Sequence, residues 1–444
     1  MRYIKCLVTT GAITILLFAC KSSPPYDNKS LHHPLLYSQT VKQLTDVIVH
    51  DIFSPPVACR IYAYATIAGY EVMAHSGQQY QSLAGQLHGL PPTPAPSEPA
   101  MIDFPLAAMI AMATTGKAMI FSENRLQAAI DSLKAKAVAA GMPGDMLKST
   151  VAYGQQVSAA ILGWSKGDQY AQTRAGGKYT VTEEEGRWTP TPPAYMAAIE
   201  PHWNELRPFV LDTASEFIAA RPPVFNMKDT SSGFYRMVNE IYTIGNTLTE
   251  EQINSADFWD CNPYKVNLSG HVSFATKKIT PGGHWINICG IAAQNAKADF
   301  AKTVCTYAKV AIALSDAFIV CWDEKFRSNL IRPETVINKY MDENWKPHLQ
   351  TPPFPEYTSG HSVASAAAAT VLTQLYGEPF HFRDSSEVEF GLPEREFPSF
   401  IAASDDAATS RLYGGIHFRP AVAEGTRQGN LVGQKVITKL KMEQ

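Results

Sequence analysis

The residues that could do chemistry lie in three short stretches in the last third of this 444-residue chain. Together they offer three cations, a hydroxyl, a backbone N–H without a neighbouring Cβ and two imidazoles. Such a set suits a compact tetrahedral oxyanion with several negative charges, because cationic forks, amide N–H groups and hydroxyls all donate to its oxygens. The candidate residues are Lys325, Arg332, Ser359, Gly360, His361, Arg411 and His417.

Lys325 and Arg332 are seven residues apart and are followed by Pro333. On one α-helix this spacing places them about 20° from a common face and roughly 10 Å apart along the axis. Both side chains could then reach one anion, and Pro333 would end the helix. The alternative is a pair of solvated surface cations.

The second and third stretches add donors and proton-transfer groups. Gly360 precedes an apolar, Ala-rich run, so its amide would lie at a helix start, where anions are favoured. Ser359 adds a hydroxyl and His361 can exchange a proton near neutral pH. Arg411 can bind two oxygens with its planar guanidinium, and His417 follows six residues later. Each is ordinary alone: Ser is a common N-cap residue, and a lone His is more often structural.

Composition limits the classes of partner. Apolar residues make up 45% of the chain and charged residues 18%, which is typical of a globular protein. The net charge of -3 and a pI near 6.5 argue against nucleic acid as the main partner. Any cationic site must therefore be local.

The N-terminus predicts an exported, lipid-anchored protein. A positively charged start precedes an apolar stretch, residues 7–18, that is too short to span a bilayer. The tetrapeptide Leu17-Phe18-Ala19-Cys20 resembles a bacterial lipobox. We therefore expect a signal peptide (1–19), membrane attachment through lipidated Cys20 in the bacterial cell envelope, and a tether (20–40). The alternative is an ordinary signal peptide with an incidental cysteine.

The rest of the chain predicts an all-α protein, because apolar residues recur at helical spacing and no long alternation indicates a sheet. We expect an N-terminal helical region (41–180), a connector rich in proline and aromatic residues (181–225), and a C-terminal oxyanion-binding helical domain (226–444). The connector should be extended and structural; alternatively, Trp188 or Trp203 lines a cleft. One unbroken helical pattern extends from His284 to Trp322, and no run after the N-terminus is predicted to cross a membrane.

The cysteines beyond the N-terminal segment are widely spaced and form no CxxC pair. We expect buried free thiols and predict no cysteine-based zinc site.

Lys-x6-Arg-Pro, Ser-Gly-His and Ser-Arg-x5-His, in this order, resemble the signature of the vanadium-dependent haloperoxidases and the related type 2 phosphatidic acid phosphatases and bacterial acid phosphatases. The resemblance implies a helical bundle of that type with an additional N-terminal helical half. It further implies a vanadate cofactor, whose site phosphate can also occupy, and oxidation of halide by hydrogen peroxide to hypohalous acid.

The resemblance also implies roles for the oxyanion-binding residues. Lys325, Arg332 and Arg411 would neutralise the oxygens of vanadate, and Lys325 would thereby also assist catalysis. Ser359 and the Gly360 amide would add hydrogen bonds.

Five further residues receive roles from the same resemblance. His417 would bond to the metal through a ring nitrogen, and His361 would act as acid and base toward hydrogen peroxide. Trp322 and Phe354 are similar to residues around the vanadate ligands of fungal chloroperoxidases. Asp260 would pair with a site arginine.

Two positions depart from the family pattern. Thr358 stands where proline is usual, which should alter only the stiffness of the turn. Ala421 stands where an aspartate is usual, four residues after His417. Loss of a carboxylate that orients the histidine can cost roughly 10–100-fold in metal affinity or activity.

Two other functions stay open at this point. One is a phosphatase acting on a phosphate ester, in which His417 forms a phosphohistidine while His361 protonates the leaving alcohol. The other is a non-catalytic surface lipoprotein. The sequence leaves the preferred halide open as well.

Overall fold

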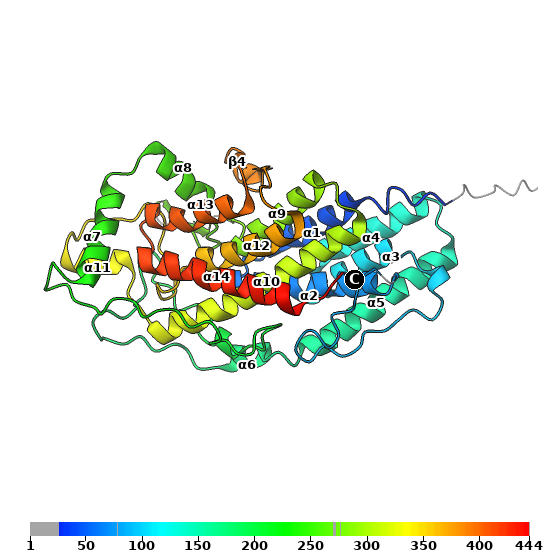
Figure 1. The fold of residues 1–444 in the computed structure, drawn as a ribbon, viewed down its shortest axis with the longest axis horizontal. Helices are drawn as coiled ribbons and strands as arrows, with labels where there is room; N and C mark the ends of the chain where they lie inside the picture. The colour runs from blue at the N-terminus through cyan, green and yellow to red at the C-terminus, as the bar shows by residue number, and fades with distance from the viewer. Residues whose placement is uncertain (1–25, 78, 270–271, 276, 444) are drawn as a thin grey trace, which may run out of the picture.

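The computed structural model describes residues 26–77, 79–269, 272–275 and 277–443. These residues form an elongated molecule in which most of the long helices run close to the long axis (Figure 1). The predicted all-α class is confirmed, with only two short β-hairpins added among the described residues. The expected signal peptide and Cys20 lie outside the described residues.

Six helices form the described part of the N-terminal half. α1 begins at Pro34, where proline occupies the first helical turn and the His33 side chain accepts from the Leu35 N–H. The second part of the expected tether, residues 34–40, is therefore helical. The six helices are α1 (Pro34–His50), α2 (Pro55–Ala74), α3 (Phe104–Lys117), α4 (Glu123–Ala139), α5 (Gly144–Ser165) and α6 (Tyr170–Ala175).

Among the residues that the structure describes, eight helices form the C-terminal half. The helical pattern expected to be continuous from His284 to Trp322 is interrupted between α9 and α10, because Asp299 accepts from the Lys302 N–H and starts a new helix. The eight are α7 (Gly233–Asn246), α8 (Glu250–Phe258), α9 (Pro281–Asn295), α10 (Phe300–Ser328), α11 (Pro333–Tyr340), α12 (Gly360–Tyr376), α13 (Phe400–Tyr413) and α14 (Arg419–Lys439).

The strands form two antiparallel hairpins. β1 (Val266–Ser269) pairs with β2 (Val272–Ala275). β3 (Phe382–Asp384) pairs with β4 (Arg395–Phe397), with Phe382 opposite Phe397. Single 3-10 turns are η1 (Pro99–Met101), η2 (Trp203–Glu205) and η3 (Val388–Phe390).

α10 is the central helix and packs against α2, α9, α12 and α14. It is long and apolar enough to cross a membrane, with a mean hydropathy of 1.7, contrary to our expectation for the chain after the N-terminus. The 18-residue window of α10 to which this hydropathy applies is nevertheless completely buried inside the protein. One hydrophobic core therefore extends from the N-terminal helices to α14.

The connector has little regular structure and lies along one side of the bundle (Figure 1). Its attachment to α10 is polar: the buried carboxylate of Asp316 accepts from the backbone N–H groups of Phe209, Val210 and Leu211 at 2.7, 2.8 and 3.2 Å. The Trp188 and Trp203 side chains are buried. These contacts agree with the interpretation of the connector as structural.

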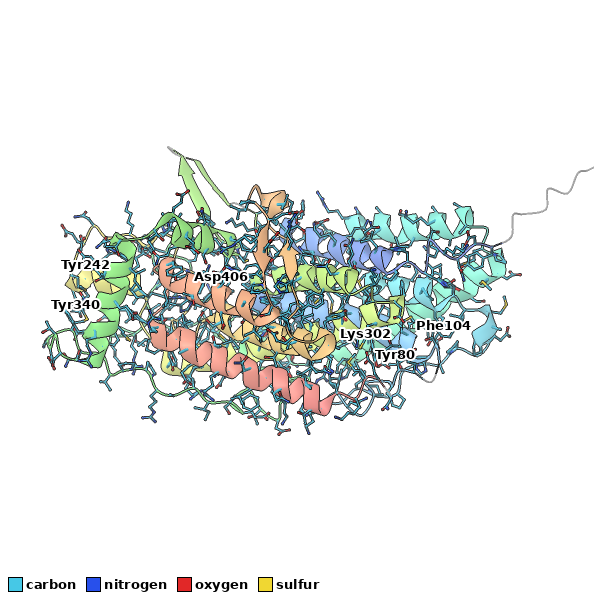
Figure 2. The ribbon with its side chains drawn as sticks, turned by 45° about the horizontal axis from the view of Figure 1, so that its top comes forward. Tyr80, Phe104, Tyr242, Lys302, Tyr340 and Asp406 are labelled. Carbon is cyan, nitrogen blue, oxygen red and sulfur yellow. The ribbon has the colours of Figure 1, made fainter. Side chains whose placement is uncertain are left out.

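Polar contacts also join α13 to the end of α8. In Figure 2, Tyr242 of α7 and Tyr340 of α11 lie near one end of the molecule, and Asp406 of α13 lies further along. The Asp406 carboxylate accepts from Ser255 Oγ at 2.9 Å and from Trp259 Nε1 at 2.7 Å. α13 thereby holds the end of α8 in place.

α12 and α14 approach each other closely through three glycines of α14, Gly425, Gly429 and Gly433. A Cβ on Gly429 would lie 2.2 Å from the backbone oxygen of Val363, and one on Gly425 would lie 2.9 Å from that of Ser359. Backbone atoms cannot move aside as a flexible side chain can. The glycines therefore set the position of α12, whose first turn carries Ser359 and Gly360.

We expect Gly429→Ala to destabilise the protein by about 1–3 kcal/mol, because the added methyl group forces the two helices apart. The measurement is urea denaturation followed by circular dichroism. Gly163→Ala is the matched control, since a Cβ at this exposed position of α5 meets nothing within 4 Å. That control should stabilise by about 0.4–1 kcal/mol. Equal stability of the two variants would contradict the close-approach argument.

Candidate active site

The first predicted stretch is divided between two helices. Lys325 lies in the last turn of α10, which ends at Ser328 with Asn329 in the left-handed conformation. Arg332 is the residue that precedes α11, and Pro333 occupies the first helical position. The prediction that both cations share one helix face, with Pro333 ending the helix, is wrong, because this proline starts a helix. The intervening turn nevertheless leaves both side chains fully buried.

The Lys325 ammonium donates to three backbone carbonyls of one loop. Its Nζ lies 3.0, 3.1 and 2.6 Å from the oxygens of Pro355, Glu356 and Thr358. These bonds use all three N–H groups of the lysine. Lys325 can therefore donate to an oxyanion only if it gives up one of these three carbonyl hydrogen bonds. Burial lowers the pKa of Lys325 to about 7, and Arg332 contributes in the same direction.

The two arginines are held by backbone carbonyls and one hydroxyl. Arg332 donates from Nε to Phe354 O at 2.8 Å and from Nη1 to Ile416 O at 2.9 Å. Arg411, in the last turn of α13, donates from Nε to Ser410 Oγ at 3.0 Å and from Nη2 to Ala256 O at 3.3 Å. Among the described residues, no carboxylate lies within ion-pair distance of Lys325, Arg332 or Arg411.

The second stretch forms the start of α12, as predicted from sequence. Ser359 is the N-cap, and its Oγ accepts from the Ser362 N–H at 3.3 Å. Gly360 and His361 are the first two residues of the helix and line a cavity. The nearest atoms to a Cβ on Gly360 would lie 3.7 Å away, so the protein itself leaves room there. Burial and the nearby Arg411 lower the pKa of His361 well below its usual value.

His417 follows the turn after α13 and is 3% exposed. Its Nδ1 lies 2.8 Å from Glu356 Oε1, and the Phe418 N–H donates to the same oxygen at 2.9 Å. With Nδ1 donating, the lone pair of Nε2 accepts from Arg332 Nη1 at 3.2 Å, so a metal at Nε2 would replace that hydrogen bond. Burial and the neighbouring Arg332 lower the pKa of His417 well below its usual value.

Glu356 is a residue that the sequence analysis missed. It is fully buried, and burial raises its pKa to about 7. The expectation that Ala421 leaves His417 without an orienting carboxylate is wrong. The carboxylate of Glu356, which comes from a different loop, contacts the imidazole of His417. Ala421 instead accepts the Ser359 N–H at 3.0 Å with its backbone oxygen. Thr358 contributes its carbonyl to Lys325 and its hydroxyl to Gln428.

Aromatic rings cover the cations on one side. The Trp322 and Phe354 ring centroids are 4.9 Å apart, and Lys325 Nζ lies 5.0 Å from the centroid of Phe354. Arg332 Cζ lies 5.1 Å from the same ring. The Trp322 indole donates to the backbone oxygen of Ile199 in the connector. Such rings stabilise cations and exclude water.

Asp260 is close to the site but does not pair directly with Arg411. Its carboxylate accepts from Lys278 at 3.0 Å and from Lys265 at 3.2 Å. Burial opposes ionisation, but these lysines outweigh it and lower the pKa of Asp260, with a smaller contribution from Arg411. The expected arginine pairing is therefore a longer-range attraction.

The cavity is lined by groups from the second and third sequence stretches, and Arg332 of the first stretch contacts His417 in its wall. Neither Trp188 nor Trp203 reaches the cavity. Its wall includes Gly360, His361, Arg411 and His417 together with Asp260 and Cys261.

Two buried nitrogens of the site, Arg332 Nη2 and His361 Nε2, have no hydrogen-bond partner among the described residues. The unpaired buried N–H of Arg332 and three buried cations without bound carboxylates are costly. A multiply charged oxyanion would compensate both, so these residues fit vanadate: Arg332, Arg411, Lys325, Ser359 and the Gly360 amide for its oxygens, and His417 Nε2 for its metal.

Comparisons with known proteins place the chain among vanadium-dependent enzymes. The family described as "VCPO second helical-bundle domain" matches residues 305–443. A bacterial vanadium-dependent iodoperoxidase structure is 47% identical, with a TM-score of 0.89 over 95% of this chain and 99% of that one. No functionally curated protein matches the chain.

Two bacterial vanadium-dependent chloroperoxidase structures share the fold. The holo form is 17% identical, with a TM-score of 0.63 over 94% of this chain and 96% of that one. The apo form is 18% identical, with a TM-score of 0.62 over 87% and 95%.

The fold and these comparisons together define a helical metalloenzyme of the haloperoxidase type. The chain belongs to the vanadium-dependent haloperoxidases. It is an enzyme with a vanadate cofactor that uses hydrogen peroxide to oxidise halide. Neither the phosphatase nor the non-catalytic scaffold is favoured by these comparisons.

We expect Glu356→Gln to weaken vanadate binding by about 10–100-fold, because the neutral amide no longer fixes the His417 ring through a carboxylate. Vanadium retained after equilibrium dialysis measures the affinity. Glu334→Gln is the control, since Glu334 is also buried but bonds to Thr351 rather than to a histidine. An unchanged affinity in Glu356→Gln would show that the carboxylate has no part in metal binding.

Proposed function

We propose that this haloperoxidase prefers iodide. The observation that carries the proposal is the 47% identity, over nearly the whole of both chains, to a protein described as an iodoperoxidase. The chloroperoxidase structures are too distant in sequence to argue for chloride. The aromatic side chains of Phe318, Trp322 and Phe354 line the cavity, and such a lining suits a large, weakly hydrated anion.

We further propose the following roles for the site residues. Arg332 and Arg411 would bind and orient the oxyanion, and Lys325, 5.0 Å from the centroid of the Phe354 ring, would add positive charge. When bound, vanadate supplies a Lewis-acidic centre that activates hydrogen peroxide toward halide without changing its own oxidation state. His417 would hold the metal through Nε2, while Glu356 holds Nδ1.

His361 is proposed to move the proton. Its depressed pKa keeps the imidazole neutral near pH 7, and its Nε2 has no partner among the described residues. A neutral ring nitrogen at the cavity wall can accept a proton from hydrogen peroxide and return it to the departing oxygen. The backbone of Trp259 hydrogen-bonds to His361 and so limits the orientation of the ring.

The test is oxidation of iodide, bromide and chloride by hydrogen peroxide in phosphate-free buffer, with and without orthovanadate. We expect vanadate-dependent turnover that phosphate suppresses. Iodide should exceed bromide in kcat/KM by at least about tenfold, or roughly 1.4 kcal/mol in activation free energy. His417→Ala should lose both activity and stoichiometric vanadium. Equal kcat/KM for bromide and iodide would overturn the halide preference, and vanadium retained by His417→Ala would overturn its role.

We also propose that the mature protein is held at a membrane of the bacterial cell envelope by lipids on Cys20. The support is the sequence alone: a charged start, a short apolar stretch and Leu17-Phe18-Ala19-Cys20. Acyl chains on one cysteine anchor a protein without a spanning helix.

We expect the wild-type protein to partition into the detergent phase after export and Cys20→Ser to move to the aqueous phase. Intact mass spectrometry should show acylation of the wild-type protein only. Cys6→Ser, within the expected signal peptide, is the matched control and should change neither result. Detergent partitioning of Cys20→Ser would contradict the anchor.

A further inference from the structure

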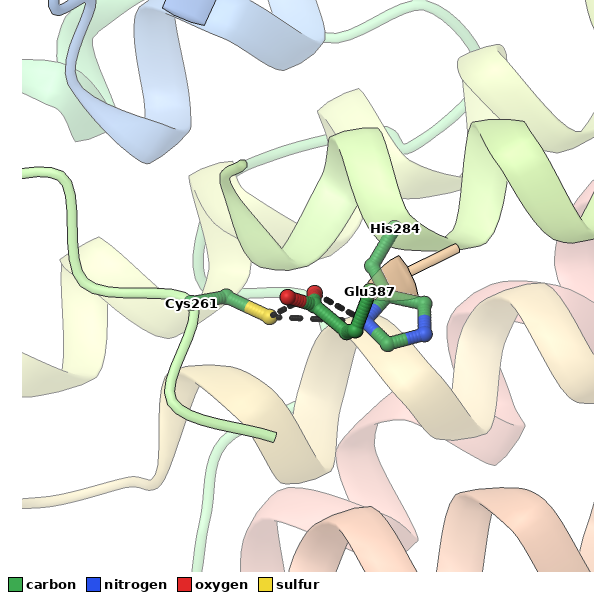
Figure 3. Close-up of side chains that lie close together, drawn as sticks. All are labelled: Cys261, His284 and Glu387. Carbon is green, nitrogen blue, oxygen red and sulfur yellow. Dashed lines mark hydrogen bonds and ion pairs between the residues drawn. The ribbon is translucent and has the colours of Figure 1, made fainter. Parts of the chain in front are cut away.

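A second cluster of ligand-type side chains lies beside the cavity. Cys261 follows α8, His284 is in the first turn of α9, and Glu387 immediately precedes η3. Figure 3 shows the three side chains directed toward one another from these separate segments. Their residues are 2%, 0% and 1% exposed. The vanadate-site residues are not members of this cluster.

The distances within the cluster match the edges of a metal coordination tetrahedron. Cys261 Sγ lies 3.5 Å from His284 Nδ1 and 3.7 Å from Glu387 Oε1, and His284 Nδ1 lies 3.1 Å from Glu387 Oε1. Bond lengths of zinc to sulfur, nitrogen and oxygen in tetrahedral sites correspond to edges of about 3.6, 3.6 and 3.4 Å in the same order. Each observed distance agrees with its edge to about 0.3 Å.

The ring nitrogen of His284 that faces away from the cluster is hydrogen-bonded to a carboxylate, as is usual for metal-binding histidines. His284 Nε2 lies 2.8 Å from Asp384 Oδ2, and the other oxygen of Asp384 accepts from the Ser386 N–H at 2.9 Å. A carboxylate at Nε2 fixes the tautomer in which Nδ1 is free to coordinate. Asp384 belongs to β3, so the β3–β4 hairpin gains a role in positioning the ligand.

A divalent cation would take the place of protons held between these side chains. Metal binding requires a deprotonated thiol and a neutral imidazole nitrogen, so it would release protons from Cys261 Sγ and His284 Nδ1.

We propose that Cys261, His284 and Glu387 bind a zinc-type divalent ion next to the vanadate site. A thiolate and an imidazole with one carboxylate select zinc over calcium or magnesium, which prefer oxygen ligands alone. With three protein ligands, the fourth position is left for water. The sequence did not predict the site because its ligands come from three separate segments without a CxxC pair.

The ion would hold one wall of the active-site cavity. Cys261 lines that cavity and follows Asp260, while the Trp259 ring stacks on His284 with centroids 4.5 Å apart. The backbone of Trp259 bonds in turn to His361. Coordination would therefore connect α9 and the β3–β4 hairpin to the segment that orients His361.

The test is metal content and cobalt spectroscopy on the full mature chain, purified without a metal-affinity tag. We expect about one zinc per chain by mass spectrometry and, after exchange to Co²⁺, intense visible bands with a thiolate-to-cobalt charge-transfer band. Cys261→Ser should abolish the charge-transfer band, and Glu387→Gln should lower the cobalt affinity by about 10-fold or more. Circular dichroism verifies that each variant is folded.

Two controls distinguish this ion from vanadium and from metal bound at an unrelated thiol. Cys289→Ser removes a buried thiol of α9 outside the cluster and should keep the charge-transfer band. His417→Ala should lose vanadium but retain zinc, so the two sites can fail independently. A folded wild-type protein that binds neither zinc nor cobalt, or a charge-transfer band that survives in Cys261→Ser, would overturn the proposal. The cluster would then be a hydrogen-bond network only.

Discussion

The structure depends on the burial of three cations, Lys325, Arg332 and Arg411, each at most 1% exposed. Desolvation of a charge costs several kcal/mol even in a relaxed protein interior, and nearby like charges add to that cost. Backbone carbonyls compensate part of it at every cation, whereas bound carboxylates would neutralise the site and remove its affinity for an anion. The surrounding elements therefore hold these three positive charges in place without neutralising them.

One irregular loop provides most of that support. The carbonyls of Phe354, Pro355, Glu356 and Thr358 accept from Lys325 and Arg332, and the Glu356 side chain holds His417. The same loop leads directly into the first turn of α12. A segment without periodicity thus joins the three sequence stretches. Such a segment is held rigid by its polar contacts rather than by its own secondary structure.

The helical class, most of the long helices and the convergence of Gly360, His361, Arg411 and His417 around one cavity could be predicted from the sequence. Apolar periodicity and short motifs carry that information locally. What could not be predicted depended on contacts between distant segments. The carboxylate for His417 was sought four residues away, at Ala421, whereas the fold supplies it from residue 356. Pro333 was expected to end a helix, but a proline is equally suited to begin one.

The position of α10 has a consequence for how the chain is divided. Its 29 residues are apolar enough to lie in a lipid bilayer, yet every residue of its spanning-length window is surrounded by protein. The N-terminal helices supply much of that surrounding, with α2 packed along α10, although they contribute no proposed vanadate ligand. The C-terminal half alone would carry all of those ligands and expose a membrane-like helix to water. The N-terminal half therefore helps to shield the apolar helix from water, while the C-terminal half carries the proposed vanadate ligands.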